Sequence, residues 1–262
     1  MAARQSYPCV RIRHDMRAKM HNPDTHRARY AALSVGKDER AAAFDMVGGG
    51  DFERVGVTER LLLDAFAPVP EGGMLIDIGC GPGRLARYLT DRKAMRYLGT
   101  DVVPELLVVA RRECDRPDWN FVEVDGFAIP AERDVADVVA IFSVFTNIYP
   151  EQSCLLFRDA WRALKPGGSL LITYFDITAA AHQRIFRDLV QHQDRRIDPL
   201  VFLDQNFIDF FAADAGFVDV RHFSPEEASV VVDGEVALID GRVLTGSFGL
   251  NQALTIARKP ER

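Results

Sequence analysis

Three aspartates stand at or near the ends of apolar runs in the first half of the chain. Asp77 lies two residues before a glycine, Asp101 ends the run RYLGTD, and Asp125 ends the run FVEVD. A carboxylate has two oxygens that can accept from a diol or from amine protons. Open α/β sheets bind ligands at the carboxyl ends of their strands, so three such acids predict one polar site. The alternative is that each aspartate only ends its strand and caps a turn.

A glycine-rich turn follows Asp77, within the segment Gly72–Leu89. Met74–Ile78 is expected to be a buried strand, because it is apolar, too short for a helix and closed by glycine, and Arg84–Leu89 continues at helical spacing. Glycine takes backbone angles closed to other residues and lets a ligand lie against the main chain. The helix that begins here would offer unpaired N–H groups to an anionic part of the ligand. The turn residues predicted to bind are Gly79, Cys80, Gly81 and Gly83.

The spacing of these glycines separates two kinds of ligand. A dinucleotide fingerprint needs G-x-G-x-x-G, whereas this chain has G-x-G-x-G, with Arg84 where the last glycine of that fingerprint would fall. The spacing therefore disfavours a dehydrogenase. Together with the acids at three strand ends, it resembles the pattern of class I S-adenosylmethionine-dependent methyltransferases, and the resemblance runs from about Gly72 to the end of the chain.

The resemblance implies a role for each acid. In that family the acid before the glycines holds the methionine amino group of S-adenosylmethionine, often through water, and Asp77 matches it. The acid that ends the second strand takes both ribose hydroxyls, and the acid after the third strand receives the adenine amino group; Asp101 and Asp125 match these positions. The further cofactor contacts are Val102 on the adenine face, Gly126 and Phe127 beside the ring, and Ser143 after the fourth strand.

The expected fold class is α/β: a doubly wound, mainly parallel seven-stranded sheet with an antiparallel last strand and an N-terminal helical cap. Short strands alternate with helices after the turn, which is typical of a parallel sheet covered by helices. The expected division is a basic N-terminal arm (1–22), a helical cap or lead-in (23–70) and the cofactor-binding domain (71–262). After the turn we expect strands Asn120–Val124, Asp137–Phe142, Ser169–Phe175, Phe217–Phe223 and Gln252–Ala257, and helices Pro104–Arg112, Gln152–Leu164, Ala179–His192 and Phe207–Ala215, with Gly216 as a C-cap.

The composition excludes several classes of protein. Of the 262 residues, 48% are hydrophobic and 27% charged, as in a globular protein, and the net charge of -6 argues against broad nucleic-acid binding. The first residues lack the apolar core of a signal peptide, and no run approaches the ~18 to 20 apolar residues that span a bilayer. Four scattered cysteines without metal-like spacing predict reduced thiols, a cytoplasmic location and no metal site. The oligomeric state is not predicted.

The acceptor side is read from the sequence after the fourth strand, IFSVFTNIYPE. It lacks the Asn/Asp-Pro-Pro-aromatic motif that many nucleic-acid and protein amide N-methyltransferases use, and Ser143–Tyr149 resembles small-molecule members of the family. The expected acceptor is therefore a small-molecule hydroxyl. A poorly acidic hydroxyl needs a base, and the candidate catalytic residues are Asp176 and His182. Their structural alternatives are a helix cap for Asp176 and a surface helix position for His182.

Two other functions stay open at this point. The first is methylation of a macromolecule, RNA or protein, which only the basic arm 1–22 supports. The second is a non-catalytic nucleoside-binding fold that serves as an interaction module. Three acids at successive strand ends argue against lost cofactor binding, but they do not establish methyl transfer.

Overall fold

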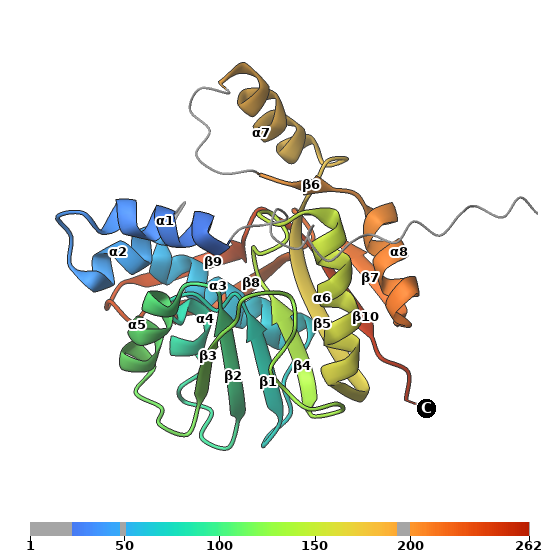
Figure 1. The fold of residues 1–262 in the computed structure, drawn as a ribbon, viewed down its shortest axis with the longest axis horizontal. Coiled ribbons are helices and arrows are strands. Elements are labelled where there is room, and N and C mark those ends of the chain that lie inside the picture. Colours follow the sequence, from blue (N-terminus) through green and yellow to red (C-terminus); the bar gives the residue numbers. More distant parts are fainter. Residues whose placement is uncertain (1–22, 48–50, 193–199, 262) are drawn as a thin grey trace, which may run out of the picture.

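The central element of the fold is a twisted sheet. The computed structural model describes residues 23–47, 51–192 and 200–261, and Figure 1 shows the sheet with helices packed around it. Its strands lie in the order β3-β2-β1-β4-β5-β10-β7, and the short strand β6 pairs with β5. The strands are β1 (Met74–Ile78), β2 (Arg96–Asp101), β3 (Asn120–Glu123), β4 (Ala136–Ile141), β5 (Leu164–Asp176), β6 (Phe202–Leu203), β7 (Val218–Phe223) and β10 (Ala253–Arg258).

The strand directions place the predicted acids at one edge of the sheet. Strands β3, β2, β1, β4 and β5 are parallel neighbours, whereas β10 is antiparallel to both β5 and β7. The register sets Asp77 opposite Gly99 and Asp101 opposite Glu123, so the carboxyl ends of β1, β2 and β3 lie together. The predicted mainly parallel, doubly wound sheet with an antiparallel last strand is confirmed, and β6 adds an eighth strand.

Helices cover both faces of the sheet. On one face α6 and α8 pack through residues such as Phe157 and Phe211, and on the other α3, α4 and α5 pack through Leu63, Leu85 and Ala110. Apolar strand residues alternate between these two cores, as a two-sided parallel sheet requires. The helices are α3 (Phe52–Phe66), α4 (Arg84–Arg87), α5 (Pro104–Cys114), α6 (Pro150–Ala163), α7 (Ala180–Gln191) and α8 (Gln205–Ala215), which ends at Gly216 in the left-handed conformation.

Two N-terminal helices extend the layer formed by α5. Helices α1 (Pro23–Ser34) and α2 (Glu39–Met46) bury Tyr30 and Ala43 against Leu106 of α5, and Figure 1 shows them above α5 at the upper left. The predicted basic arm, residues 1–22, lies outside the described residues. No helix in the described ranges is long and apolar enough to cross a lipid bilayer.

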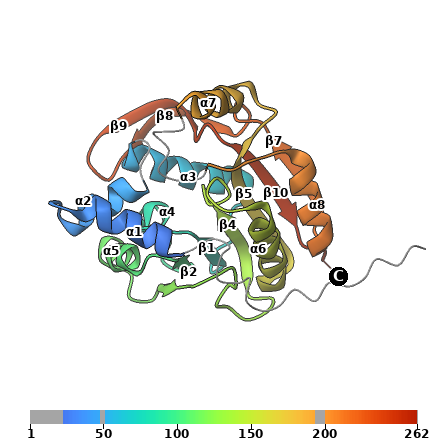
Figure 2. The ribbon, with the colours of Figure 1, turned by 45° about the horizontal axis from the view of Figure 1, so that its top comes forward.

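A β-hairpin near the C-terminus was not predicted. Strands β8 (Ser229–Ala237) and β9 (Val243–Gly249) form a separate two-stranded sheet that packs on α3, with Phe248 buried beside Val57 and Tyr88. The hairpin is also tied to the start of α3, because Arg242 pairs with Asp51 at 2.7 Å. It therefore braces α3 against the sheet, and Figure 2 shows the hairpin lying beside α3.

Several element boundaries differ from those expected, and two of the differences have a clear cause in the backbone hydrogen bonds. The helix predicted over Arg84–Leu89 ends at Arg87, because the N–H groups of Tyr88 and Leu89 bond to carbonyls three residues back rather than four. Strand β5 begins at Leu164, five residues before the predicted start. Its early part is held by backbone bonds with Lys259, which follows β10.

Candidate active site

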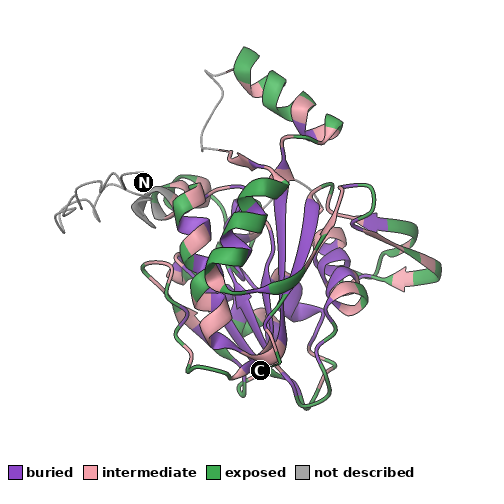
Figure 3. Ribbon diagram, turned by 90° about the vertical axis from the view of Figure 1, so that its right-hand side faces the viewer, coloured by how far each residue is buried: buried purple, intermediate pink, exposed green. Residues whose placement is uncertain are grey.

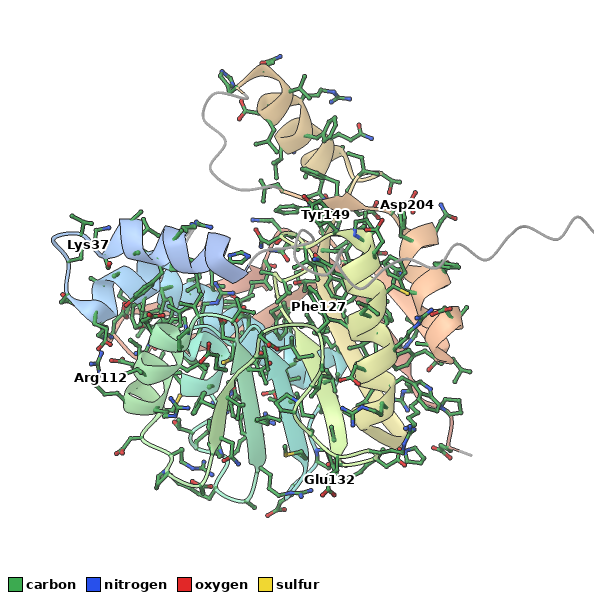
Figure 4. The ribbon with its side chains drawn as sticks, viewed as in Figure 1. Lys37, Arg112, Phe127, Glu132, Tyr149 and Asp204 are labelled. Atoms are coloured by element: carbon green, nitrogen blue, oxygen red, sulfur yellow. The ribbon has the colours of Figure 1, made fainter. Side chains whose placement is uncertain are left out.

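A cavity of about 710 Å³ lies at the carboxyl ends of the parallel strands. Residues from α1, α2 and α3 wall one side of it, and residues near β6 and before β10 wall the other. Figure 4 shows Phe127 at the upper end of the sheet, below Tyr149 at the start of α6. The cavity is lined by these members of the predicted cofactor set: Gly79, Asp101, Val102, Asp125, Gly126, Phe127 and Ser143.

The glycine turn is closed by its own hydrogen bonds. The N–H groups of Gly79 and Cys80 donate to the carbonyl of Thr100 at 2.8 and 3.0 Å, and that of Gly83 donates to the carbonyl of Cys80 at 3.1 Å. Helix α4 spans only four residues. The N–H groups of these turn residues are therefore occupied, and anion binding at the start of α4 stays a prediction.

The glycines of the turn are required by conformation and by close packing. Gly79, Gly81 and Gly83 all have positive φ, at 72°, 55° and 82°. A Cβ on Gly79 would lie 2.4 Å from the side chain of Val144, and one on Gly81 would lie 2.9 Å from that of Val47. Of the three, Gly79 lines the cavity.

Cys80 borders the small hollow beside Asp77 rather than the main cavity. Its side chain is buried in the apolar core between the sheet and α3, beside Gly99 of β2, and does not line the cavity. Burial raises the pKa of its thiol well above the usual value, so the sulfur stays protonated. Cys80 is thus a small buried residue of the turn.

Asp101 connects the end of β2 to the glycine turn. Its Oδ2 accepts the N–H of Gly81 and its Oδ1 accepts the N–H of Val103, both at 2.9 Å. The side chain is buried, and burial raises its pKa to about 6. Each carboxylate oxygen keeps one further lone pair, so the group can still accept from two hydroxyls in the cavity.

Asp77 lies behind the turn, outside the main cavity. It faces a hollow of about 20 Å³ that shares Gly79 and Arg84 with the cavity wall. Its Oδ2 accepts from the hydroxyl of Tyr97 at 2.7 Å, and burial raises its pKa to about 7. A hollow of this size holds about one water molecule. The arrangement therefore fits contact with a ligand through a water.

The loop after β3 presents the third acid. Asp125 is exposed and lines the cavity together with its neighbours Gly126 and Phe127. Val102, the residue after Asp101, lines the same region. A flat heterocycle placed here would lie between apolar side chains, with a carboxylate at its edge.

The end of β4 forms a polar cluster that the sequence revealed only in part. Ser143 has a φ of 60°, unusual for a residue with a side chain, and its N–H donates to Thr173 Oγ1 at 2.8 Å. Its hydroxyl accepts from Gln252 Nε2 at 3.0 Å, and its carbonyl accepts from Asn147 Nδ2 at 3.0 Å. Strained backbone of this kind often marks a functional site. Cavity residues from these segments that sequence reasoning missed are Thr146, Asn147, Asn251 and Gln252.

Asp176 and His182 do not line the cavity, and both make structural contacts. Asp176 Oδ1 accepts from the N–H and the hydroxyl of Thr178, which closes the turn before α7. His182 is fully buried rather than on the surface. Its Nδ1 accepts the N–H of Asp176 at 2.8 Å, so its Nε2 carries the proton and donates to the carbonyl of Asn251 at 2.8 Å. Because neither side chain reaches the cavity, this geometry does not support the predicted catalytic roles, which stay predictions.

A buried ion pair supports the turn from α3. Arg84 Nη2 lies 2.5 Å from Glu59 Oε1, and Arg84 Nη1 donates to the carbonyl of Val47 at 2.9 Å. Burial raises the pKa of Glu59, while the guanidinium of Arg84 opposes the rise. Sequence reasoning missed this pair, because the two residues lie 25 positions apart. Its effect is to hold α2, α3 and the turn in one arrangement.

The comparison with protein families agrees with the geometry. Residues 75–168 match a family model described as a methyltransferase domain, and this segment contains the glycine turn and all three acids. Residues 75–168 therefore form a methyltransferase domain, and the sheet around them has the class I fold of S-adenosylmethionine-dependent methyltransferases. S-adenosylmethionine is thus the cofactor that this fold is built to bind, and the cavity with its converging acids fits that group.

Several named methyltransferases are similar in sequence. The chain is 32% identical over 117 residues to the ribosomal protein L11 methyltransferase of Geobacter metallireducens, with 44% of this chain and 37% of that protein covered. It is 30% identical over 153 residues to the demethylmenaquinone methyltransferase of Renibacterium salmoninarum, and the match covers 55% of this chain and 62% of that protein. It is 29% identical over 180 residues to the trans-aconitate 2-methyltransferase of Variovorax paradoxus, and the match covers 65% of this chain and 67% of that protein. The chain thus spans between about a third and two thirds of these relatives.

Solved methyltransferase structures share the fold. A chain from the Haloferax volcanii complex of the Trm112 methyltransferase activator and a methyltransferase superposes with a TM-score of 0.61 at 22% identity, with 85% of this chain and 98% of that chain covered. Phosphoethanolamine N-methyltransferase 2 of Haemonchus contortus, solved with S-adenosyl-L-methionine, gives a TM-score of 0.57 at 17% identity, covering 88% and 60%. Both support the fold assignment.

Proposed function

We propose that this methyltransferase transfers the methyl group of S-adenosylmethionine to a small-molecule acceptor, at a hydroxyl oxygen. The observation that carries the proposal is one cavity in which acids at the ends of β2 and β3 face the same space as the hydroxyl, amide and apolar side chains that follow β4 and precede β10. Bound S-adenosylmethionine supplies a methyl group already activated by its sulfonium charge. The residues then have to align two molecules and exclude water.

The donor end of the cavity is assigned to the three acids. We expect Asp77 to hold the methionine amino group through a water in the adjoining hollow, and Asp101 to accept from the ribose hydroxyls with its remaining lone pairs. Asp125 is assigned to the adenine amino group, with Phe127 and Val102 on the faces of the ring. The end of β4 at Ser143 is then the part of the cavity left for the acceptor.

The acceptor end is neutral. The segment after β4 and the segment before β10 both place hydroxyl or amide side chains in the cavity. Neither segment contributes a carboxylate or an imidazole there. Asp176 and His182 lie outside the cavity, and its lining residues His26 and Asp51 come from α1 and the start of α3, so we expect an acceptor hydroxyl at the β4 end to ionise without a base. A phenol or an enol does this more readily than an alcohol. The named relatives include two with small-molecule acceptors, and the ribosomal protein L11 methyltransferase keeps a macromolecular acceptor as the alternative.

The test is a transfer assay with three matched acceptor classes: phenols, enols and aliphatic alcohols of similar size. Formation of S-adenosylhomocysteine and of the methylated product is followed by mass spectrometry. We expect methyl ethers from the phenols or enols and none from the alcohols, with rates that rise with pH as each acceptor ionises. Methylation of RNA or of a ribosomal protein, with all three small-molecule classes left untouched, would contradict the proposal.

A further inference from the structure

Helix α7 stands away from the rest of the fold and exposes an apolar side. Figure 3 shows most of this helix as exposed, with a buried residue only near its first turn. Ile185, Phe186 and Val190 are 37%, 45% and 55% exposed. With Leu189 they occupy positions i, i+1, i+4 and i+5, which lie on one side of a helix. We call these four residues the α7 apolar face.

The α7 apolar face is continuous with the cavity. Ile185 belongs to both, because it also lines the cavity. A series of aromatic rings follows the same path. Phe175 lines the cavity and stacks on Phe202 of β6, with 5.4 Å between the ring centroids. Phe202 in turn contacts Phe186 of α7 edge-to-face, also with 5.4 Å between the centroids. An apolar molecule that leaves the acceptor end therefore meets apolar side chains from the cavity to the surface.

We propose that the α7 apolar face binds an extended apolar tail of the acceptor. This inference rests on the proposed function, and it names the substrate class: a small acidic hydroxyl head attached to a hydrocarbon chain. The head would lie at the neutral end of the cavity near Ser143, and the tail would follow Phe175 and Phe202 out to Phe186 and Val190.

An exposed apolar helix could also bind a membrane or a second copy of the chain, but the continuity of the α7 apolar face with the cavity favours an apolar tail of the acceptor. A membrane surface or a second copy of the chain would contact Phe186 and Val190, but neither explains why the same apolar strip enters the cavity at Ile185 and Phe175. The ring contacts also hold the strip in place before any ligand binds. A hydrocarbon chain is linear, so it can fill the cavity end and the α7 apolar face at once.

The test uses 1-hexanol, 1-octanol and 1-decanol as tail probes, titrated calorimetrically into the protein saturated with S-adenosylhomocysteine. Burial of a methylene strengthens binding roughly fourfold. We expect the affinity to rise about 15-fold for each two carbons added. Phe186→Glu and Val190→Glu should remove most of this dependence on length. Val231→Glu, at a residue 72% exposed on the β8–β9 hairpin, is the matched control and should keep it.

Titration of each variant with S-adenosylmethionine separates this proposal from the proposed function. Unchanged donor affinity in all variants, with length dependence lost only in the α7 variants, supports the apolar tail. An affinity that does not depend on chain length in the unmodified protein overturns it. Two other results would also overturn it, each in combination with an alcohol series that shows no effect of length. One is binding to anionic lipid vesicles that Phe186→Glu abolishes, and the other is dimer formation that Phe186→Glu abolishes.

Discussion

The substitution Asp101→Asn separates the two tasks that we assign to this carboxylate. Oδ1 and Oδ2 hold the N–H groups of Val103 and Gly81 at 2.9 Å each, and the same oxygens are assigned to the two ribose hydroxyls. An amide has one oxygen in place of two. The variant therefore keeps one acceptor and turns an NH₂ group toward the other partners.

The expected effect on stability is small, because two contributions oppose each other. Losing one hydrogen bond to a charged acceptor costs about 1.5 to 3 kcal/mol. Burial, however, raises the pKa of Asp101 from 3.8 to about 6, which corresponds to a cost of about 3 kcal/mol for the ionised carboxylate in the folded protein. The neutral amide of asparagine does not carry this cost. Since a raised carboxyl pKa makes the folded protein less stable as pH rises from about 4 to 6, the variant should lose this pH dependence.

The expected effect on donor binding is large. One of two hydroxyl contacts to a charged acceptor is lost, which corresponds to about 10- to 100-fold weaker affinity. Calorimetric titration with S-adenosylmethionine at pH 8 measures it, thermal unfolding monitors the fold, and Asp219→Asn on the exposed strand β7 is the control. An Asp101→Asn protein that folds and binds the donor as tightly as the unmodified chain would refute the assignment of the ribose site.

Three further predictions concern other parts of the site. Because burial raises the pKa of Asp77 to about 7 and its ionised form is assigned to the cationic amino group, donor affinity should rise between pH 6 and 8, and calorimetry of Asp77→Asn should show no such rise. His182→Ala should lower stability by about 2 to 4 kcal/mol in denaturant unfolding, since it leaves the N–H of Asp176 and the carbonyl of Asn251 without partners; lost turnover at unchanged stability would instead indicate catalysis. Gly79→Ala should destabilise the fold by about 1 to 3 kcal/mol more than Gly72→Ala, because both glycines have positive φ but only Gly79 meets another side chain; equal losses would remove the packing argument.

The sheet, and the presence of Asp101 and Asp125 in one cavity, could be predicted because their signals are local. A run of apolar residues that ends in glycine or aspartate marks a strand end, and the parallel order then brings Asp101 and Asp125 to one edge. The hairpin also has a local signal, which was overlooked. Its strands are rich in valine, and its connection contains Asp240–Gly241, a pair typical of hairpin turns.

The contacts of individual side chains could not be predicted, because they depend on residues far apart in the chain. His182 is buried and bonds to the carbonyl of Asn251, 69 positions away. Its spacing along the helix alone cannot distinguish a buried histidine from a surface one. The N–H of Gly81 is occupied by Asp101, 20 positions away, so this donor of the turn is not free for a ligand. In both cases the partner, rather than the residue type, decides the role.

The central claim is that the cavity at the ends of β1, β2 and β4 binds S-adenosylmethionine. Calorimetric titration of the purified protein with S-adenosylmethionine, with S-adenosylhomocysteine and with NADH tests it most directly. We expect micromolar binding of the first two and none of NADH, since the glycine turn has the wrong spacing for a dinucleotide and its N–H groups are occupied. Binding of NADH, or of none of the three, would contradict the account.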